Sequence, residues 1–223
     1  MVVRLTLPRL TLALHCAAVQ FEEVVRRRRM VRTYTEDPVP RRLVDRVLDA
    51  GLRAPSAGFS QGWAFLVLEG AEQTDLFWRA TERPGTAPEP GGRLDRQRQA
   101  PVVIVPFAHK EAYLQRYAEP DKAGLGLDRE EAWPVPFWEV DTAFATMSML
   151  LAATDAGLGA LFFGLFDGGE GLHATFGIPH GYRPIGAISI GWPAPGDPRS
   201  PSLARGWRER NSVVHYGKWR PPT

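Results

Sequence analysis

Apolar positions recur with a helical period in several stretches of the chain. From Pro40 onward they are spaced near 3.6 residues apart, which predicts an amphipathic helix that ends near Gly51. Residues 137–156 are apolar on nearly all sides and rich in small residues, as is typical of a central buried helix. Shorter helices are expected at 20–29, where the last turn is basic, and at 170–177.

Continuous apolar runs predict strands between these helices. They cover residues 64–69, 101–108, 158–166 and 184–192. Helices and strands therefore alternate loosely along the chain. This order fits either an α/β or an α+β domain, and the pattern alone does not choose between them.

Three stretches lack any such period. Residues 81–99 are polar and rich in Pro and Gly, so we expect a long mobile loop, and residues 118–136 form a second irregular segment. Residues 1–20 are expected to be an N-terminal extension, helical or disordered, ahead of a single domain at 21–223. A secretory signal remains an alternative for the extension, although Thr11 and His15 interrupt its apolar run.

Composition narrows the class of protein. The 223 residues are 44% hydrophobic and 23% charged with a net charge of +2, which is typical of a globular protein and argues against a general nucleic-acid binder. A lone cysteine, Cys16, excludes a disulfide framework and a cysteine-based metal site. The five histidines show no metal-ligand spacing, and no apolar run is long enough to span a bilayer. We therefore expect no metal, no membrane and a cytoplasmic location.

Basic and polar clusters are the candidate chemistry. The stretch "RRRRMVRTY" (26–34) holds more positive charge than a helix end needs, so water or an anion must offset it. The turn "RAPSAGFSQGW" (53–63) could cradle a phosphate or a polyol, or be an ordinary loop. Arginines within 203–219 could meet a phosphate, or form a solvated tail. No dinucleotide-binding glycine motif, Walker loop or nucleophile elbow occurs.

These clusters, taken in order, resemble the nitroreductase family of flavoproteins. The resemblance rests on Arg28-Arg29-x-x-Arg32-x-Tyr34, "DPVP", "APSAGFSQGWAFLVLE", "AATDAGLGALFFGLF", "FGIPHGYRPIGAISIGWP" and "VVHYGKW". It covers roughly residues 20–219, and "SQGW" with "VVHYGKW" is most similar to an actinobacterial subgroup. It implies an α+β fold, a mixed sheet flanked by helices in an intertwined homodimer.

The resemblance also implies an FMN site shared between two subunits. Arg28 and Arg29 would contact the phosphate or ribityl oxygens, and Arg32 the pyrimidine edge of the flavin. The other expected contacts are a loop from the partner subunit, the end of a strand near flavin N5, and a C-terminal basic pair with Arg210 as a competitor. These are Pro55, Ser56, Ala57 and Phe59; Phe163, Gly164 and Leu165; and Arg205 and Arg208. Many relatives have Asn where Phe59 stands.

The implied activity is transfer of a hydride from NAD(P)H, via flavin N5, to a nitroaromatic, quinone or enone by a ping-pong mechanism. No catalytic side chain is implied. Other interpretations remain open. One is a reductase of a biosynthetic intermediate, and another is a flavin-sequestering or flavin-sensing protein without turnover. A third is an enzyme that fragments FMN to dimethylbenzimidazole, although that branch carries Asp at the position of Met30.

Overall fold

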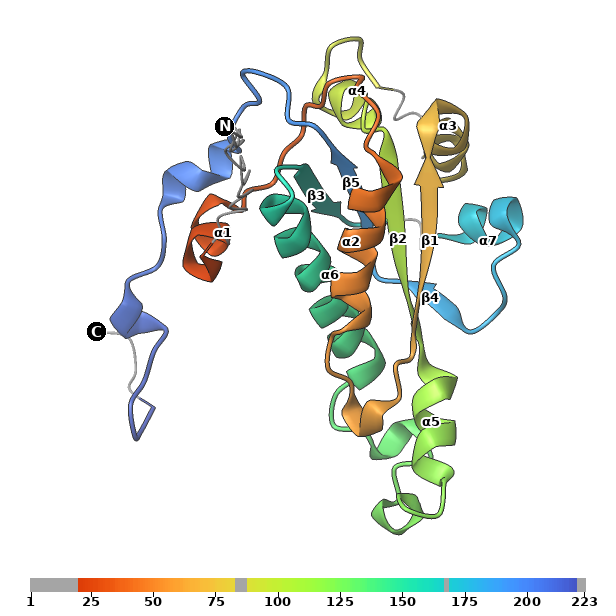
Figure 1. Cartoon of the computed structure of the whole chain (residues 1–223). Coiled ribbons are helices and arrows are strands. Elements are labelled where there is room, and N and C mark those ends of the chain that lie inside the picture. The colour runs from red at the N-terminus through yellow and green to blue at the C-terminus, as the bar shows by residue number, and fades with distance from the viewer. Residues whose placement is uncertain (1–19, 83–87, 167–168, 220–223) are drawn as a thin grey trace, which may run out of the picture.

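The computed structural model describes residues 20–82, 88–166 and 169–219, where helices cover both faces of one sheet (Figure 1). The strands are β1 (Trp63–Glu69), β2 (Val102–His109), β3 (Gly159–Phe163), β4 (Tyr182–Pro184) and β5 (Ala187–Gly191). The α-helices are α1 (Phe21–Arg27), α2 (Arg41–Leu52), α3 (Gly70–Ala80), α4 (Arg93–Arg98), α5 (Lys110–Ala118), α6 (Phe137–Asp155) and α7 (Glu170–Phe176). Short 3-10 turns occur at Ala57–Phe59, Ala123–Leu125, Glu130–Ala132, Pro201–Arg205 and Arg210–Ser212.

The sheet has the strand order β1-β2-β5-β3, and β4 also pairs with β2. All of these strand pairs are antiparallel. One isolated parallel bridge joins Met30 to Ala160 on the edge strand β3. Antiparallel strands with helices on both faces place the chain in the α+β class, which settles the choice that the sequence pattern left open.

Alternation along β2 builds two cores. Val102 and Ile104 pack on one face against α2 and α6, whereas Val103 and Val105 pack on the other against α3 and α7. Because both faces are covered, the strand is a continuous apolar run, as the sequence predicted. Burying each such side chain contributes roughly 1.5–3 kcal/mol to stability.

Most of the predicted elements are confirmed, with two differences and two additions. The run 184–192, predicted as one strand, is divided into β4 and β5 by Ile185 and Gly186. The segment 81–99, expected to be a loop, contains the helix α4, while its residues 83–87 lie outside the described part. Helices α3 and α5 were not anticipated. The predicted extension at 1–20 lies outside the described residues apart from Gln20. In the described ranges, no helix is long and apolar enough to cross a bilayer.

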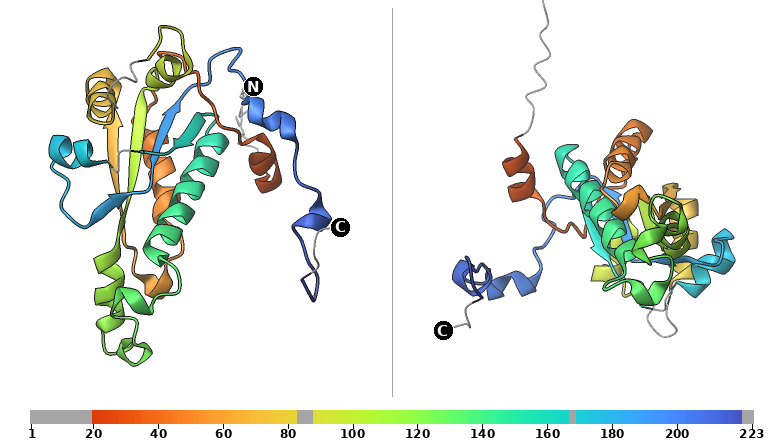
Figure 2. Two further views of the ribbon diagram at one scale, coloured as in Figure 1. Left: turned by 180° about the vertical axis from the view of Figure 1, so that it is seen from behind. Right: turned by 90° about the horizontal axis from the view of Figure 1, so that it is seen from below.

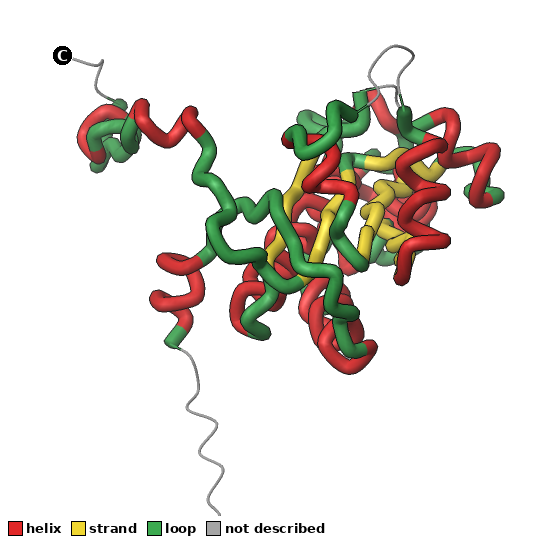
Figure 3. The backbone as a smooth tube through the Cα atoms, turned by 90° about the horizontal axis from the view of Figure 1, so that it is seen from above, coloured by secondary structure: helices red, strands yellow, loops and turns green. Residues whose placement is uncertain are grey.

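Two segments stand away from the layered body: α1 and the C-terminal arm, which we define as residues 201–219 (Figures 2 and 3). Large apolar side chains on the arm face solvent, with Trp207 93% and Trp219 81% exposed. The helix α6, expected to be buried on nearly all sides, likewise exposes Phe144 and Met147 in the single chain. Exposed apolar surface of this extent is typical of sites that bind another molecule.

Candidate functional site

The arginine segment, residues 28–35, runs along the outer edge of β3. The N–H of Val31 donates to the carbonyl of Ala160 at 3.0 Å, next to the Met30–Ala160 bridge. Farther along, the N–H of Thr35 donates to the carbonyl of Trp192 at 2.9 Å. These backbone bonds hold the predicted arginines against the strand that ends at Phe163.

Arg29 and Arg32 both meet Asp197, but in different ways. The guanidinium of Arg29 forms an ion pair with the carboxylate of Asp197, and the backbone N–H of Arg32 donates to the same carboxylate at 2.9 Å. Burial raises the pKa of Asp197, but these hydrogen bonds outweigh it and hold the pKa below its ordinary value. Asp197 is therefore an ionised anchor beneath the arginine segment.

The arginines of this segment are not equivalent. Arg29 lines a basic pocket of about 400 Å³ together with Arg26, Arg27 and Arg199. The side chain of Arg28 makes no hydrogen bond or ion pair with a described residue. Since side chains alternate along an extended segment, Arg29 points away from the side on which Arg32 lies.

Arg32 lies in an electropositive environment. Its Nη1 donates to the carbonyl of Met30 at 3.1 Å. Burial lowers the pKa of Arg32, and the charge of Arg93 lowers it further, while Asp197 opposes both. The side chain of Arg93 has no hydrogen bond or ion pair with a described residue. Arg32 and Arg93 therefore repel each other, and neither guanidinium forms an ion pair with a carboxylate of the described residues.

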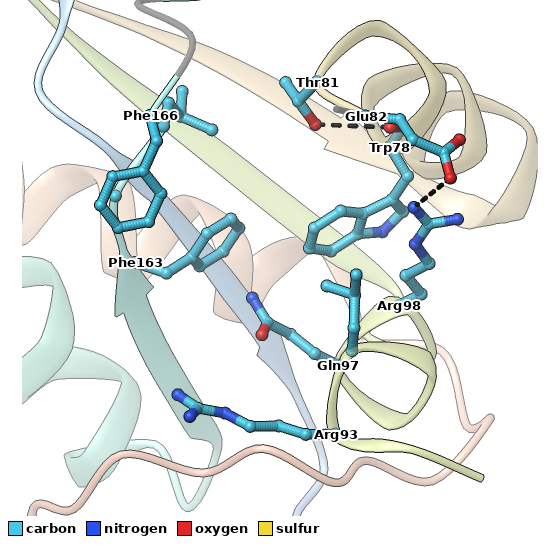
Figure 4. A pocket seen from close by; sticks show the side chains of 11 residues that line it. Trp78, Thr81, Glu82, Arg93, Gln97, Arg98, Phe163 and Phe166 are labelled. Carbon is cyan, nitrogen blue, oxygen red and sulfur yellow. Dashed lines mark hydrogen bonds and ion pairs between the residues drawn. The ribbon is translucent and has the colours of Figure 1, made fainter. Parts of the chain in front are cut away.

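Beside these cations, a pocket of about 370 Å³ opens between the end of β3, α3 and α4 (Figure 4). One wall is aromatic, since Trp78 and Phe163 stack with ring centroids 5.4 Å apart and planes at 15°. The pocket is lined by Trp78, Thr81, Glu82, Arg93, Leu94, Gln97, Arg98, Phe163, Gly164, Leu165 and Phe166. It therefore includes the predicted group Phe163, Gly164 and Leu165.

Polar groups reach this pocket from α4. Gln97 is 6% exposed as a residue, and its side-chain amide points toward the space between Phe163 and Arg93 (Figure 4). Arg98 lies over the Trp78 ring at 5.7 Å from its centroid and pairs with Glu82 at 3.5 Å. The buried Nε1–H of Trp78 has no hydrogen-bond partner in the described part of the chain. A buried donor without a partner is costly, so the pocket is suited to a polar, planar ligand.

Sequence reasoning missed Trp78, Arg93 and Gln97. The stretch "RLDRQR" has neither apolar periodicity nor a strong cap, and six residues are too few to reveal a helix. Trp78 lies in a helix that was not anticipated. The available signal was the spacing of Arg93, Arg96 and Gln97, which lie three and four residues apart. This spacing places side chains together only if the segment is a helix, and the helix was not predicted.

The predicted loop residues come together, but elsewhere on the molecule. Ser56 and Ala57 begin a turn in which Phe59 is 74% exposed and has a φ of 56°. The N–H of Ala57 donates to Asp141 of α6 at 2.8 Å. This turn follows α2 beside α5, at the opposite end of the body from α3 and α4 (Figure 1). The turn and the aromatic pocket of one chain therefore do not face a common ligand.

The predicted C-terminal pair also lies apart from the pocket. Arg205 and Arg208 are exposed residues of the arm. Arg208 donates to the carbonyl of Ser212 at 3.2 Å, and the competitor Arg210 donates to the hydroxyl of Tyr216 at 2.8 Å. Both partners belong to the arm itself. Arg205 has no hydrogen bond or ion pair with a described residue.

These observations fit a flat anionic cofactor such as FMN. The aromatic wall and the polar groups of Trp78 and Gln97 suit a heteroaromatic ring, and the cations Arg28, Arg32 and Arg93, whose guanidinium groups form no ion pair with a described residue, suit negative charge. No cluster of metal-ligating side chains occurs in the part of the chain that the structure describes.

Comparisons with known proteins identify relatives that match most of the chain. The chain is 30% identical over 178 residues, 77% of its length and 76% of the relative's, to a Methanothermobacter thermautotrophicus protein named "Putative NADH dehydrogenase/NAD(P)H nitroreductase". It is 29% identical over 195 residues, 82% of its length and 86% of the relative's, to the 5,6-dimethylbenzimidazole synthase of Rhodospirillum rubrum.

Solved structures share the fold. A Desulfovibrio desulfuricans "putative nitroreductase in complex with fmn" superposes with a TM-score of 0.65 at 24% identity, covering 90% of this chain and 98% of that one. The model of the nitroreductase family matches residues 25–192. This match confirms the resemblance found in the sequence and the oxidoreductase class that it implied: the chain belongs to the nitroreductase family.

Proposed function

We propose that this protein is an FMN-dependent oxidoreductase that carries a hydride from NAD(P)H to a small acceptor such as a nitroaromatic, quinone or enone. The observation that carries the proposal is the aromatic pocket at the end of β3, with the cations Arg32 and Arg93 beside it and the buried, unpartnered Nε1–H of Trp78 in its wall. Family membership and a relative named for NAD(P)H support the same cofactors.

The residues of the chain would divide the work of binding. Arg32 and Arg93 would hold the electron-rich edge of the ring, Gln97 would hydrogen-bond to it, and Phe163 would pack against it. Arg28 would meet the phosphate with Arg205 or Arg208, whereas Arg29 would do so only by exchanging its bond with Asp197. A bound flavin supplies two-electron redox chemistry, so the protein has only to bind, orient and shield it.

A homodimer completes this site. The turn at Ala57–Phe59 cannot share a ligand with the pocket of its own chain, and the arm leaves its own body (Figures 1 and 2). A second copy related by a two-fold axis would bring one protomer's turn to the other's pocket and cover the exposed apolar side chains. A cytoplasmic location remains an expectation from the family.

Two other functions are less well supported. Fragmentation of FMN is favoured by the 29% identity to a dimethylbenzimidazole synthase. However, Met30 packs partly buried against the core, where it brings no titratable group. Sequestration of FMN without turnover would need a closed site, whereas the Phe59 side chain is largely exposed.

The decisive experiment is a visible spectrum of the purified protein before and after anaerobic NADH or NADPH. We expect flavin bands that bleach with one nucleotide and return on adding a quinone. Bands that persist would favour sequestration, and aerobic formation of dimethylbenzimidazole would favour fragmentation. A protein that shows no flavin, even after reconstitution with FMN, would refute the proposal.

A further inference from the structure

Asp141 is a buried acidic residue near the N-terminal end of the apolar helix α6. It is 2% exposed, and its Oδ2 accepts two hydrogen bonds of 2.8 Å, from the backbone N–H of Ala57 and from the hydroxyl of Tyr113. Tyr113 on α5 is itself fully buried. Burial, the hydrogen bond to Asp141 and its charge raise the pKa of Tyr113, so its hydroxyl remains a donor. Burying a carboxylate costs free energy unless hydrogen bonds offset the loss of water, and these two bonds do so.

The backbone that Asp141 holds is strained. Gly58, Phe59 and Gln61 have φ values of 61°, 56° and 48°, and the last two carry side chains that disfavour this region. Such conformations persist only where the surroundings enforce them, and they gather at functional sites. Gln61 is fixed by its N–H, which donates to the hydroxyl oxygen of Ser56 at 3.0 Å.

A second contact comes from α5. Nε of Arg116 donates to the carbonyl of Gly58 at 2.9 Å, while the two terminal nitrogens of its guanidinium grip Asp121 at 2.7 Å. The Tyr117 ring fills the space next to Gly58, where a Cβ would lie 2.8 Å from Cε2. Helices α5 and α6 thus clamp the turn from two sides, although its outer residues Pro55 and Phe59 face solvent.

We propose that Asp141, with Tyr113, is a positioning residue that fixes the turn at residues 55–61 in the shape that completes the partner subunit's cofactor site. The inference rests on the proposed function and deepens it. Asp141 touches neither cofactor nor substrate. It acts through the backbone of Ala57, and it links cofactor binding in one protomer to the packing of α5 and α6 in the other.

The first test compares FMN binding in three variants. Asp141→Asn preserves the shape of the side chain but replaces the carboxylate with a neutral amide. The hydrogen bonds that Ala57 and Tyr113 donate to it should weaken, so we expect the Kd for FMN to rise about tenfold. Tyr113→Phe removes only the second donor and should raise it about threefold. Thr146→Val is the matched control, because Thr146 is buried on the same helix but bonds only within it, to the carbonyl of Thr142.

The visible spectrum of the bound flavin separates positioning from plain stability. Asp141→Asn should shift the flavin bands at saturating FMN, whereas Thr146→Val should not. If Asp141→Asn lowers the Tm yet leaves both the Kd and the bands unchanged, the residue is merely structural and the inference fails while the proposed function stands. If the wild-type protein binds no FMN, both fail.

A mixed dimer tests whether the turn acts on the other subunit. Asp141→Ala and Arg32→Ala chains with different tags are coexpressed, and the dimer carrying both tags is isolated. A turn that acts across the dimer leaves one site with no defect, so the mixed dimer should bind about one FMN, and the parent dimers much less. A turn that serves its own subunit would leave a defect in each site, and binding would not be restored.

Discussion

Two segments that were expected to reach the cofactor, the turn at 55–61 and the C-terminal arm, are built in opposite ways. The turn is held by a buried carboxylate, a guanidinium and a tyrosine ring from α5 and α6. The arm bonds to itself through Arg208 and Arg210 and exposes its tryptophans. The turn is thus held in place within a single chain, whereas the arm makes few contacts with the body of its own chain.

This difference gives the turn and the arm different entropic costs when the cofactor binds. The turn is already ordered when the subunit folds, so it adds little entropic cost to cofactor binding. In the proposed homodimer the partner orders the arm, so the contribution of the arm to cofactor binding is coupled to dimerisation. Changes in the turn should therefore affect affinity at fixed assembly, and changes in the arm should affect both together.

The largest effect is expected from removing the arm by truncation after Ser200. Covering each large apolar side chain contributes about 1.5–3 kcal/mol, so losing Leu203, Trp207 and Trp219 should weaken dimerisation at least about a hundredfold. The protein should elute as a monomer in light-scattering chromatography and carry little FMN. Arg205→Ala with Arg208→Ala is the control and should lose FMN while remaining dimeric. A truncated protein that is dimeric and fully loaded would overturn this view of the arm.

The next effect is expected from Gly58→Ala, which strains the turn without touching the arm. Gly58 and Gly126 share a left-handed conformation, with φ of 61° and 67°, so an alanine at either costs about 1–2 kcal/mol. Only at Gly58 would the new Cβ meet a neighbour, Tyr117. FMN titration should therefore show a Kd raised about tenfold for Gly58→Ala and unchanged for Gly126→Ala. Equal effects in the two variants would mean that the shape of the turn does not matter.

A smaller effect is expected at the root of the arm, where Asp197 binds Arg29. Because the folded-state pKa of Asp197 is lowered, its stabilisation is present above the unfolded value near 3.9 and is lost as pH falls through the folded value. Asp197→Asn should cost about 1.5 kcal/mol at pH 7, and the two proteins should converge in strong acid. Urea unfolding from pH 7 to about pH 2 measures this, and a gap that widens toward low pH would contradict it.

The smallest effect is expected from Phe59→Asn on the exposed tip of the turn. Asparagine tolerates a positive φ, and the Phe59 side chain is 74% exposed, so the free energy of unfolding should hardly change. The ratio of kcat/KM between a quinone and a nitroaromatic should shift about two- to fivefold. A change in stability alone would make Phe59 a packing residue.

The sequence predicted those parts whose signal is local and periodic. Helices α2 and α6 and strands β1 and β2 follow from apolar spacing, and the motif order identified the family. It did not predict α4, whose six polar residues carry no period. It also did not predict the role of Asp141, because an acidic residue in an apolar run acquires meaning only when Ala57 and Tyr113 are seen to meet it.

The backbone of the arginine segment has a consequence for folding that is separate from its side chains. Met30 and Val31 pair with Ala160 on the free side of β3, so they cover the start of an edge strand that would otherwise offer open N–H and C=O groups. Chains in which this segment detaches would present a strand ready to pair with another molecule. The stretch that carries the arginines should thus also protect the protein from aggregation, and deleting it should lower the solubility of the protein.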